Sequence, residues 1–212
     1  AYFCSPFQEA AIFTADAVGE WTTTTVGYAR GNELKLEKET RFPHSLGLLY
    51  SAFTAFLGFE VNEGEYKVMG MAPYGQPKYA DKVSRLIKVA QDGSYRLNMD
   101  YFSYHHSLTR SFSGEFEKLF GKPRNPKDSN TLDPYYADLA ASVQVVVEEV
   151  ILKIVNDLYR QTGLKRLCMA GGVALNSVVN GRILRETPFE ELFIQPAAGD
   201  GGGAVGAAFY AY

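Results

Sequence analysis

The chain has 212 residues, of which 46% are hydrophobic and 21% charged, a composition typical of globular proteins. Its formal net charge of −3 disfavours a general surface for nucleic acid or for anionic membranes. No apolar run is long enough to span a bilayer, and the two cysteines, Cys4 and Cys168, are too few for a disulfide framework. We therefore expect a cytoplasmic protein in which Cys168, within an apolar run, is a buried free thiol.

The first part of the chain has the pattern of three strands. Residues 9–16 form an apolar run that ends in an acid, residues 21–28 are rich in strand-forming side chains, and residues 33–40 alternate in polarity over part of their length. Gly31 and Asn32 form a dipeptide typical of hairpin turns. We predict three antiparallel strands here.

Helical patterns occupy two longer segments. Residues 45–57 are almost entirely apolar and predict a buried helix, with Ser45 placed to cap it. The dipeptide Asp133-Pro134 is a typical helix start, and apolar residues then recur at helical spacing as far as Gly163. This second segment predicts the longest helix of the chain.

The region between these helices, residues 59 to about 132, is less regular, and we predict that it is an insertion. Within it we predict a helix at 78–91, followed by a turn at Asp92-Gly93 and an aromatic-rich stretch at 101–106.

The last part of the chain alternates between strand and helix patterns. We predict a strand at 166–170, a helix at 174–186, a strand at 191–195 and a helix from about 201 to 212. An antiparallel meander followed by alternating helices and parallel strands predicts an α/β fold. This element order resembles a ribonuclease-H-like lobe of the actin-like ATPase and sugar-kinase group, with a mixed sheet flanked by helices and a partly helical insertion. Proteins of that group carry two such lobes with the nucleotide between them, and this chain supplies one.

Two stretches of the last part share one arrangement. Residues 167–176 and 193–208 each read as a short buried strand, a glycine turn and the first turn of a helix, with Asn176 and Asp200 where strand becomes helix. Glycine lets a ligand approach the backbone closely, and helix N-termini favour anions such as phosphate. Two such turns, the second with an acid, indicate a phosphate-and-metal site.

Six motifs carry a more specific signal. They are Ser5–Ala11, Asp16–Trp21, His44–Tyr50, Gly64–Gly75, Ala170–Asn176 and Gln195–Ala204. In this order, over essentially the whole chain, they resemble the O-carbamoyltransferase family, which includes enzymes of nodulation-factor and antibiotic tailoring. The family's catalytic module is in turn similar to the universal tRNA threonylcarbamoyl transferases.

The resemblance implies a transferase with a defined set of substrates. Family enzymes make carbamoyl-adenylate from carbamoyl phosphate and ATP in a separate domain. The module resembled here then passes the carbamoyl group to a hydroxyl of a sugar, nodulation factor or antibiotic. The resemblance also implies that residues 1–212 are one C-terminal lobe of this module, a fragment of a longer protein with the upstream lobe and the carbamoyl-adenylate-forming domain absent.

The resemblance places metal and nucleotide contacts residue by residue. Iron(II), or another divalent metal, is expected at Asp16 and Asp200. Nucleotide contacts are expected at Gly47, Lys67, Gly171, Gly172 and Asn176. Family members supply two further metal ligands from a His-x-x-x-His pair just upstream of the Ser5 motif, and this chain begins after that pair. We therefore expect the chain alone to bind iron weakly or not at all, two carboxylates being a more plausible Mg²⁺ or Mn²⁺ site. No general base is evident, and we expect it in the absent lobe.

Simpler interpretations remain open for each of these residues. Asp200 can be a helix cap, Asp16 a turn residue and Asn176 a structural hydrogen-bonding group. Lys67 can form a surface pair with Glu65.

Other residues have weaker claims to function. Neighbouring histidines in an extended segment point to opposite faces, which disfavours a metal pair at His105 and His106. His44 is expected to be structural, and Trp21 and the aromatics of 101–104 are expected in the core or at a lobe interface.

Two further functions stay open. A tRNA threonylcarbamoyl transferase shares the chemistry, although the negative net charge disfavours it. The chain can also be an isolated, inactive nucleotide-binding lobe, whose exposed surface would favour partners or a homodimer.

Overall fold

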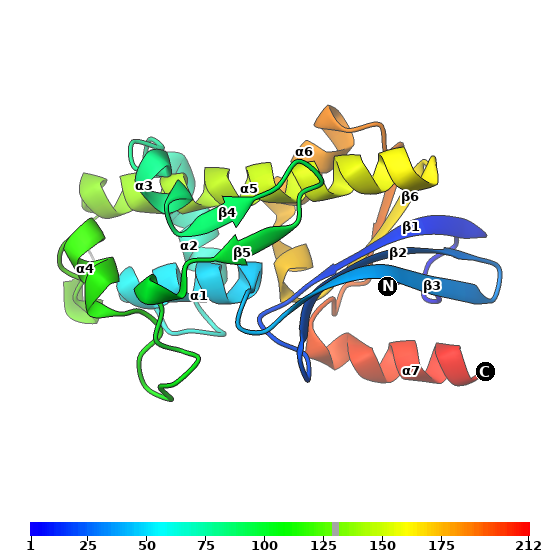
Figure 1. The fold of residues 1–212 in the computed structure, drawn as a ribbon, viewed down its shortest axis with the longest axis horizontal. Helices are drawn as coiled ribbons and strands as arrows, with labels where there is room; N and C mark the ends of the chain where they lie inside the picture. Colours follow the sequence, from blue (N-terminus) through cyan, green and yellow to red (C-terminus); the bar gives the residue numbers. More distant parts are fainter. Residues whose placement is uncertain (129–131) are drawn as a thin grey trace. The chain divides into compact units, whose positions relative to one another are not determined.

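The computed structural model describes residues 1–128 and 132–212 (Figure 1). The strands are β1 (Glu9–Ala15), β2 (Thr22–Arg30), β3 (Glu33–Arg41), β4 (Ile87–Val89), β5 (Tyr95–Leu97), β6 (Arg166–Ala170) and β7 (Glu191–Ile194). The α-helices are α1 (Leu46–Phe56), α2 (Glu65–Met71), α3 (Ala80–Ser84), α4 (Gly114–Phe120), α5 (Pro134–Thr162), α6 (Ser177–Glu186) and α7 (Gly203–Ala211). The short 3₁₀ helices are η1 (Ala72–Tyr74), η2 (Met99–Tyr101), η3 (Pro126–Asp128), η4 (Gly172–Leu175) and η5 (Asp200–Gly202).

The chain forms two compact units. The first comprises residues 1–47, 90–94 and 150–212, and the second comprises residues 48–89 and 95–149. Helices α1 and α5 contribute residues to both units.

The first unit is built on a five-stranded mixed sheet with the order β3-β2-β1-β6-β7. Strands β1, β2 and β3 pair antiparallel, as predicted, while β1, β6 and β7 pair parallel. In the central strand, Phe13 lies opposite Val26 on one side and Met169 on the other. A meander that continues into parallel strands beside β1 is the arrangement of a ribonuclease-H-like lobe, so the predicted fold class is confirmed.

Both faces of this sheet are covered by helices. Figure 1 shows the C-terminal part of α5 and helix α7 on opposite sides of it. On one face, buried Ile12 and Cys168 pack with Tyr2 in a hydrophobic cluster, against which Phe3 also packs. The rings of Phe3 and Tyr210, the latter from α7, are 5.8 Å apart. Cys168 is a fully buried free cysteine, as predicted, and burial raises the pKa of its thiol.

The second unit has an aromatic core where α1 and α4 meet. Phe53 and Phe56 of α1 lie edge-on or tilted to Phe116 and Phe120 of α4, with centroids 5.0 Å apart for Phe53 and Phe116. All four side chains are almost completely buried. Because aromatic pairs in such geometries add to the stabilisation from area burial, this cluster anchors α4 on α1.

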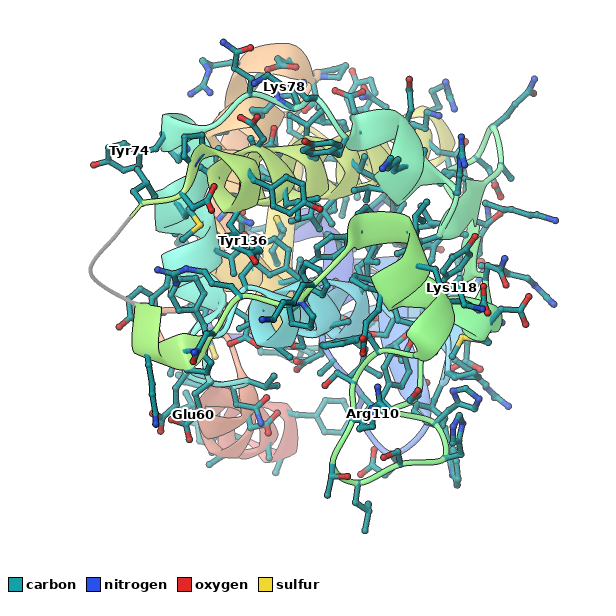
Figure 2. The ribbon with its side chains drawn as sticks, turned by 90° about the vertical axis from the view of Figure 1, so that its left-hand side faces the viewer. Glu60, Tyr74, Lys78, Arg110, Lys118 and Tyr136 are labelled. Carbon is teal, nitrogen blue, oxygen red and sulfur yellow. The ribbon has the colours of Figure 1, made fainter. Side chains whose placement is uncertain are left out.

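Polar contacts fasten the loop after η1 onto α5 within the same unit. Lys78 Nζ lies 2.7 Å from Asp138 Oδ2, and Asp138 Oδ1 accepts the Gln76 N–H at 2.8 Å. A further hydrogen bond joins α5 to the segment after α4: the Tyr136 hydroxyl donates to Lys122 O at 3.1 Å. Figure 2 shows the side chains of Lys78 and Tyr136 in this unit.

The predicted helix at 78–91 is wrong over most of its length. Only α3 is helical, and β4 forms an antiparallel hairpin with β5 through the predicted Asp92-Gly93 turn. Gly93 has a φ of +79°, which reverses the chain at a conformation that glycine adopts readily. A Cβ at this position would lie 2.6 Å from Ile154 N, so the turn is also packed tightly against α5.

The last two predicted helices begin differently from the prediction. The helix predicted at 174–186 is divided into η4 and α6, because Asn176 has a non-helical ψ of 89°. The final helix begins as η5 and becomes α-helical at Gly203. The long helix α5 ends where predicted, before Gly163 at φ +64°.

Two expectations about aromatic side chains have different outcomes. Trp21 is 68% exposed, so it is not in the core, and its alternative place at a lobe interface stays a prediction. His105 and His106 do not point to opposite faces, because the segment is a turn rather than a strand, and their ring nitrogens lie 3.0 Å apart. Burial, and then the neighbouring His106, lower the pKa of His105.

Within the part of the chain that the structure describes, no helix combines the length and the apolarity needed to cross a bilayer.

Candidate ligand site at the carboxyl edge of the sheet

Asp16 is the first residue after the central strand β1. Its N–H donates to Thr23 O at 2.9 Å, and its own carboxylate Oδ1 accepts the Ala17 N–H at 2.8 Å. Oδ2 has no hydrogen-bond partner among the described residues. The side chain is half-buried and is held at Oδ1, which leaves Oδ2 as an acceptor that a ligand could use.

Gly47, in the first turn of α1, lies directly against the end of β1. A Cβ at this position would be 2.6 Å from the backbone of both Asp16 and Ala17. The hydroxyl of Ser45 donates to Asp16 O at 2.8 Å. Glycine at 47 therefore allows the start of α1 to approach the Asp16 peptide closely.

The turn after β6 reaches the same point from the neighbouring strand. Gly171 has a φ of +93° and a ψ of 160°, and a Cβ on it would lie 2.1 Å from Ala15 O. A Cβ on Gly172 would lie 3.1 Å from Asp16 Oδ1. Gly171 is thus required by close approach to the backbone of β1, whereas a side chain at 172 would press on the Asp16 carboxylate, against which η4 begins.

Asp200 follows the next parallel strand, β7. The Gly171 N–H donates to Ala198 O at 2.7 Å, which joins the two glycine turns two residues before Asp200. Asp200 is exposed and begins η5. Asp16 directly follows β1, and Asp200 lies six residues beyond the end of β7, in the turn that the Gly171–Ala198 hydrogen bond links to the turn after β6. That the two carboxylates share one site stays a prediction.

Asn176 is a structural hydrogen-bonding group, which was the simpler of its two predicted roles. Its side-chain oxygen accepts the Val179 N–H at 3.3 Å and so caps α6. One turn later, Asn180 Nδ2 donates to Ala174 O at 2.8 Å and ties η4 to the helix. Capping does not exclude a nucleotide contact, which stays a prediction.

Lys67 belongs to the second unit, and its assignment to the nucleotide stays a prediction. Its ammonium lies 5.7 Å from the Tyr66 ring centroid and 5.9 Å from that of Phe59. Glu65 instead accepts hydrogen bonds from the Ser51 hydroxyl at 2.8 Å and the Asn62 N–H at 3.1 Å. Among residues 1–128 and 132–212, Lys67 and Glu65 form no ion pair with each other.

The donor set at the sheet edge determines which metals suit it. Within the described ranges, no three His, Cys, Asp or Glu side chains gather as a metal-binding group, so His105 and His106 lack a third ligand of these types. Asp16 and Asp200 offer hard carboxylate oxygens, which favour Mg²⁺ or Mn²⁺ and need added ligands to favour iron. The free Oδ2 of Asp16 fits a divalent cation at this edge.

Sequence reasoning named Asp16 and the glycines as candidates, which stay predictions, but it did not predict the residues that hold Asp16 in place. Ser45 was expected only as a helix cap, and Thr23 as one of several strand threonines. Thr23, 2% exposed, donates its hydroxyl to His44 O at 2.5 Å while its carbonyl accepts the Asp16 N–H. The run of threonines at 22–25 was the signal available, but a strand pattern does not tell which hydroxyl is buried.

Comparison with known proteins gives a consistent result. Residues 1–209 match the protein family described as "Carbamoyltransferase N-terminus". The uncharacterized protein sll1178 of Synechocystis is 54% identical over 98% of this chain and 34% of its own length. Nodulation protein NolNO of Sinorhizobium fredii is 34% identical over 98% of this chain and 29% of its own length. A tRNA N6-adenosine threonylcarbamoyltransferase of Listeria innocua is 28% identical over 82% of this chain and 56% of its own length.

Proposed function

We propose that this chain, which belongs to the carbamoyltransferase family, is the part of an O-carbamoyltransferase that binds carbamoyl-adenylate and directs its carbamoyl group to an acceptor hydroxyl. The family match over residues 1–209 carries the proposal. The chain spans about a third of the length of sll1178 and NolNO, so the activity, substrates and partners of the whole protein are part of the proposal.

The proposed reaction exchanges one acyl bond for another. The bond between the carbamoyl carbon and the adenylate phosphate oxygen breaks, and a bond to the acceptor oxygen forms. AMP leaves, and the acceptor hydroxyl gives up its proton to a base that we place in the remainder of the polypeptide. Carbamoyl phosphate and ATP supply the adenylate in a separate domain, and the acceptor is a small molecule such as a sugar, nodulation factor or antibiotic.

The chain's own residues would hold the adenylate. Gly47, Gly171 and Gly172 would contact the nucleotide through their main-chain N–H and C=O groups where the ends of β1 and β6 meet. The place of a Cβ on Gly47 or Gly171 is filled by the protein's own backbone, so the support for this assignment is their position beside Asp16. Asn176 would contribute a donor and an acceptor near the start of α6, where N–H groups favour phosphate. Lys67 would neutralise phosphate charge.

Asp16 and Asp200 would hold a divalent metal, iron(II) in the whole protein where further ligands complete the set. When bound, the metal would supply Lewis-acid polarisation of the carbamoyl oxygen and stabilise charge on the departing phosphate. The support within this chain is Asp16 Oδ2, which has no partner among the described residues while Oδ1 accepts the Ala17 N–H.

The proposal is tested with the full-length protein, carbamoyl phosphate, ATP and a panel of sugar and aminoglycoside acceptors. Mass spectrometry should detect an acceptor that gains one carbamoyl group, together with AMP. Asp16→Asn and Asp200→Asn should each lower turnover at least about a hundredfold, the scale of losing one preorganised charge-stabilising group. Glu33→Gln changes an exposed acid at the start of β3 and should leave turnover unchanged. Wild-type turnover in both aspartate variants would contradict the proposed site.

The Listeria innocua relative supports a second candidate, a tRNA-modifying enzyme with the same group-transfer chemistry. The two candidates differ in the group transferred and in the acceptor: a carbamoyl group to a small-molecule hydroxyl, or a threonylcarbamoyl group to the N6 amine of a tRNA adenosine. Gel-shift titration of the full-length protein with unmodified tRNA separates them: tight, salt-sensitive binding would favour the tRNA enzyme. An inactive lobe predicts neither product formation nor heat on titration with ATP and Mg²⁺.

A further inference from the structure

The main chain at Asp16 is held on both sides by protein hydrogen bonds. Its N–H donates to Thr23 O at 2.9 Å, and its carbonyl accepts the Ser45 hydroxyl at 2.8 Å. Ser45 is fully buried and Thr23 is 2% exposed, so water does not compete for these bonds. The peptide that carries the Asp16 side chain therefore has little freedom to tilt.

Packing against Gly47 also restricts the Asp16–Ala17 peptide. The position that a Cβ on Gly47 would occupy is 2.6 Å from the carbonyl carbon and oxygen of Asp16. The first turn of α1 is thus in direct contact with the Asp16–Ala17 peptide, and Ser45, immediately before α1, holds it there.

The carboxylate itself is fixed at one oxygen only. Oδ1 accepts the Ala17 N–H at 2.8 Å and lies beside the bare backbone of Gly172. Oδ2 has no partner within the described residues. The side chain can therefore offer a ligand Oδ2, in one direction, while Oδ1 keeps its hydrogen bond to the Ala17 N–H.

We infer that Ser45 is a positioning residue, which holds the Asp16 peptide so that Oδ2 is presented as a single, preoriented oxygen ligand to a divalent cation. This inference rests on the proposed metal role of Asp16. A ligand that is already held in its bound orientation has less freedom to lose on binding, and this raises affinity. Loss of the Ser45 hydroxyl leaves Asp16 in place but lets its peptide tilt, and the cation then meets a mobile carboxylate.

The test uses the full-length protein and Mn²⁺ alone as the probe, with affinity measured by calorimetry. Ser45→Ala should weaken Mn²⁺ binding about tenfold, the scale seen when groups that orient metal ligands are removed. Ser45→Cys keeps the size and a weak donor and should lie between wild type and Ser45→Ala. The matched control is Ser51→Ala, on the same helix: Ser51 is 5% exposed and donates instead to Glu65 Oε1. It should cost comparable stability in urea unfolding and leave Mn²⁺ affinity within twofold of wild type, a range set by measurement error.

Asp16→Asn separates failure of this inference from failure of the proposed function. If Asp16→Asn abolishes Mn²⁺ binding while Ser45→Ala leaves it unchanged, the positioning role is overturned and the metal role of Asp16 stands. If Asp16→Asn binds Mn²⁺ as wild type does, or wild type does not bind Mn²⁺, both are overturned. If Ser45→Ala and Ser51→Ala weaken Mn²⁺ binding equally, the weakening reflects lost stability alone, and the inference is also overturned.

Discussion

Gly171→Ala is the substitution to which this site should be most sensitive. Gly171 links the end of β6 to η4, and its φ of +93° with ψ of 160° lies in a region that is essentially restricted to glycine. The position of an added Cβ is 2.1 Å from Ala15 O and 2.6 Å from Ala15 C. Both of these atoms belong to the backbone of the central strand, so no flexible side chain can move aside.

The size of the effect follows from these two costs. Holding alanine in this backbone region costs about 1–3 kcal/mol. Forcing a methyl group into a close-packed position costs about 1–3 kcal/mol more. We therefore expect a loss of roughly 2–6 kcal/mol, a large part of the 5–15 kcal/mol typical of a folded protein. The chain can reduce the cost only by lifting the turn from β1, which would break the Gly171–Ala198 hydrogen bond and move the two glycine turns apart.

Urea unfolding followed by circular dichroism measures the loss, and hydrogen exchange over 167–176 reports the lifting of the turn. Gly203→Ala is the matched control, because Gly203 has a helical φ of −59° and nothing lies within 4 Å of an added Cβ. It should be neutral or stabilising by up to about 1 kcal/mol. If Gly171→Ala unfolds at the same urea concentration as Gly203→Ala, the account of close packing between η4 and β1 is wrong.

Three smaller effects follow from individual contacts. Asn176→Ala removes the acceptor for the Val179 N–H and should cost about 1 kcal/mol of unfolding free energy, whereas Asn176→Asp should retain most of it. The Ser94 hydroxyl and N–H hold the pKa of Asp92 down to about 2, below its ordinary value of 3.8. The stability that Asp92 adds is therefore complete above about pH 5 and is lost as the pH falls through 2. Asp92→Asn should lower the melting temperature slightly at pH 7 and not at pH 1.5, and an equal deficit at both pH values would contradict this. Cys168 should react with a thiol reagent only as fast as the protein unfolds, because it is buried and burial raises its pKa; rapid labelling in the native state would show that the sheet face is open.

The arrangement of the sheet could be predicted from the sequence because local and tertiary preferences agree there. The hairpin dipeptide at Gly31, the apolar run of β1 and the helical spacing of α5 each indicate the element that forms. The prediction of a helix at 78–91 failed because local and tertiary preferences conflict there. Residues 87–89 (Ile-Lys-Val) alternate like a strand, but three residues are too few to outweigh the helical pattern around them; they form β4 because the turn at Gly93 returns β5 to pair with them.

The acids and glycines proposed for the candidate site have a sequence pattern, whereas the residues that support Asp16 do not. Acids and glycines at strand ends have a recognisable pattern, so Asp16, Asp200 and Gly171 could be named from the sequence. The hydrogen bond from Ser45 to Asp16 joins positions 29 residues apart and leaves no periodic trace. The placement of His105 and His106 failed for a similar reason, since their side-by-side rings depend on a turn that two adjacent histidines do not reveal.

A double-mutant cycle on Mn²⁺ affinity in the full-length protein tests the central claim, that Asp16 and Asp200 act on one ligand. Asp16→Asn, Asp200→Asn and the double variant are compared with wild type by calorimetry. Because both carboxylates are proposed to hold the same cation, the double variant should bind little worse than either single variant, giving a coupling of at least about 1 kcal/mol. Losses that simply add, or a single variant with unchanged affinity, would show that the two side chains do not share a site.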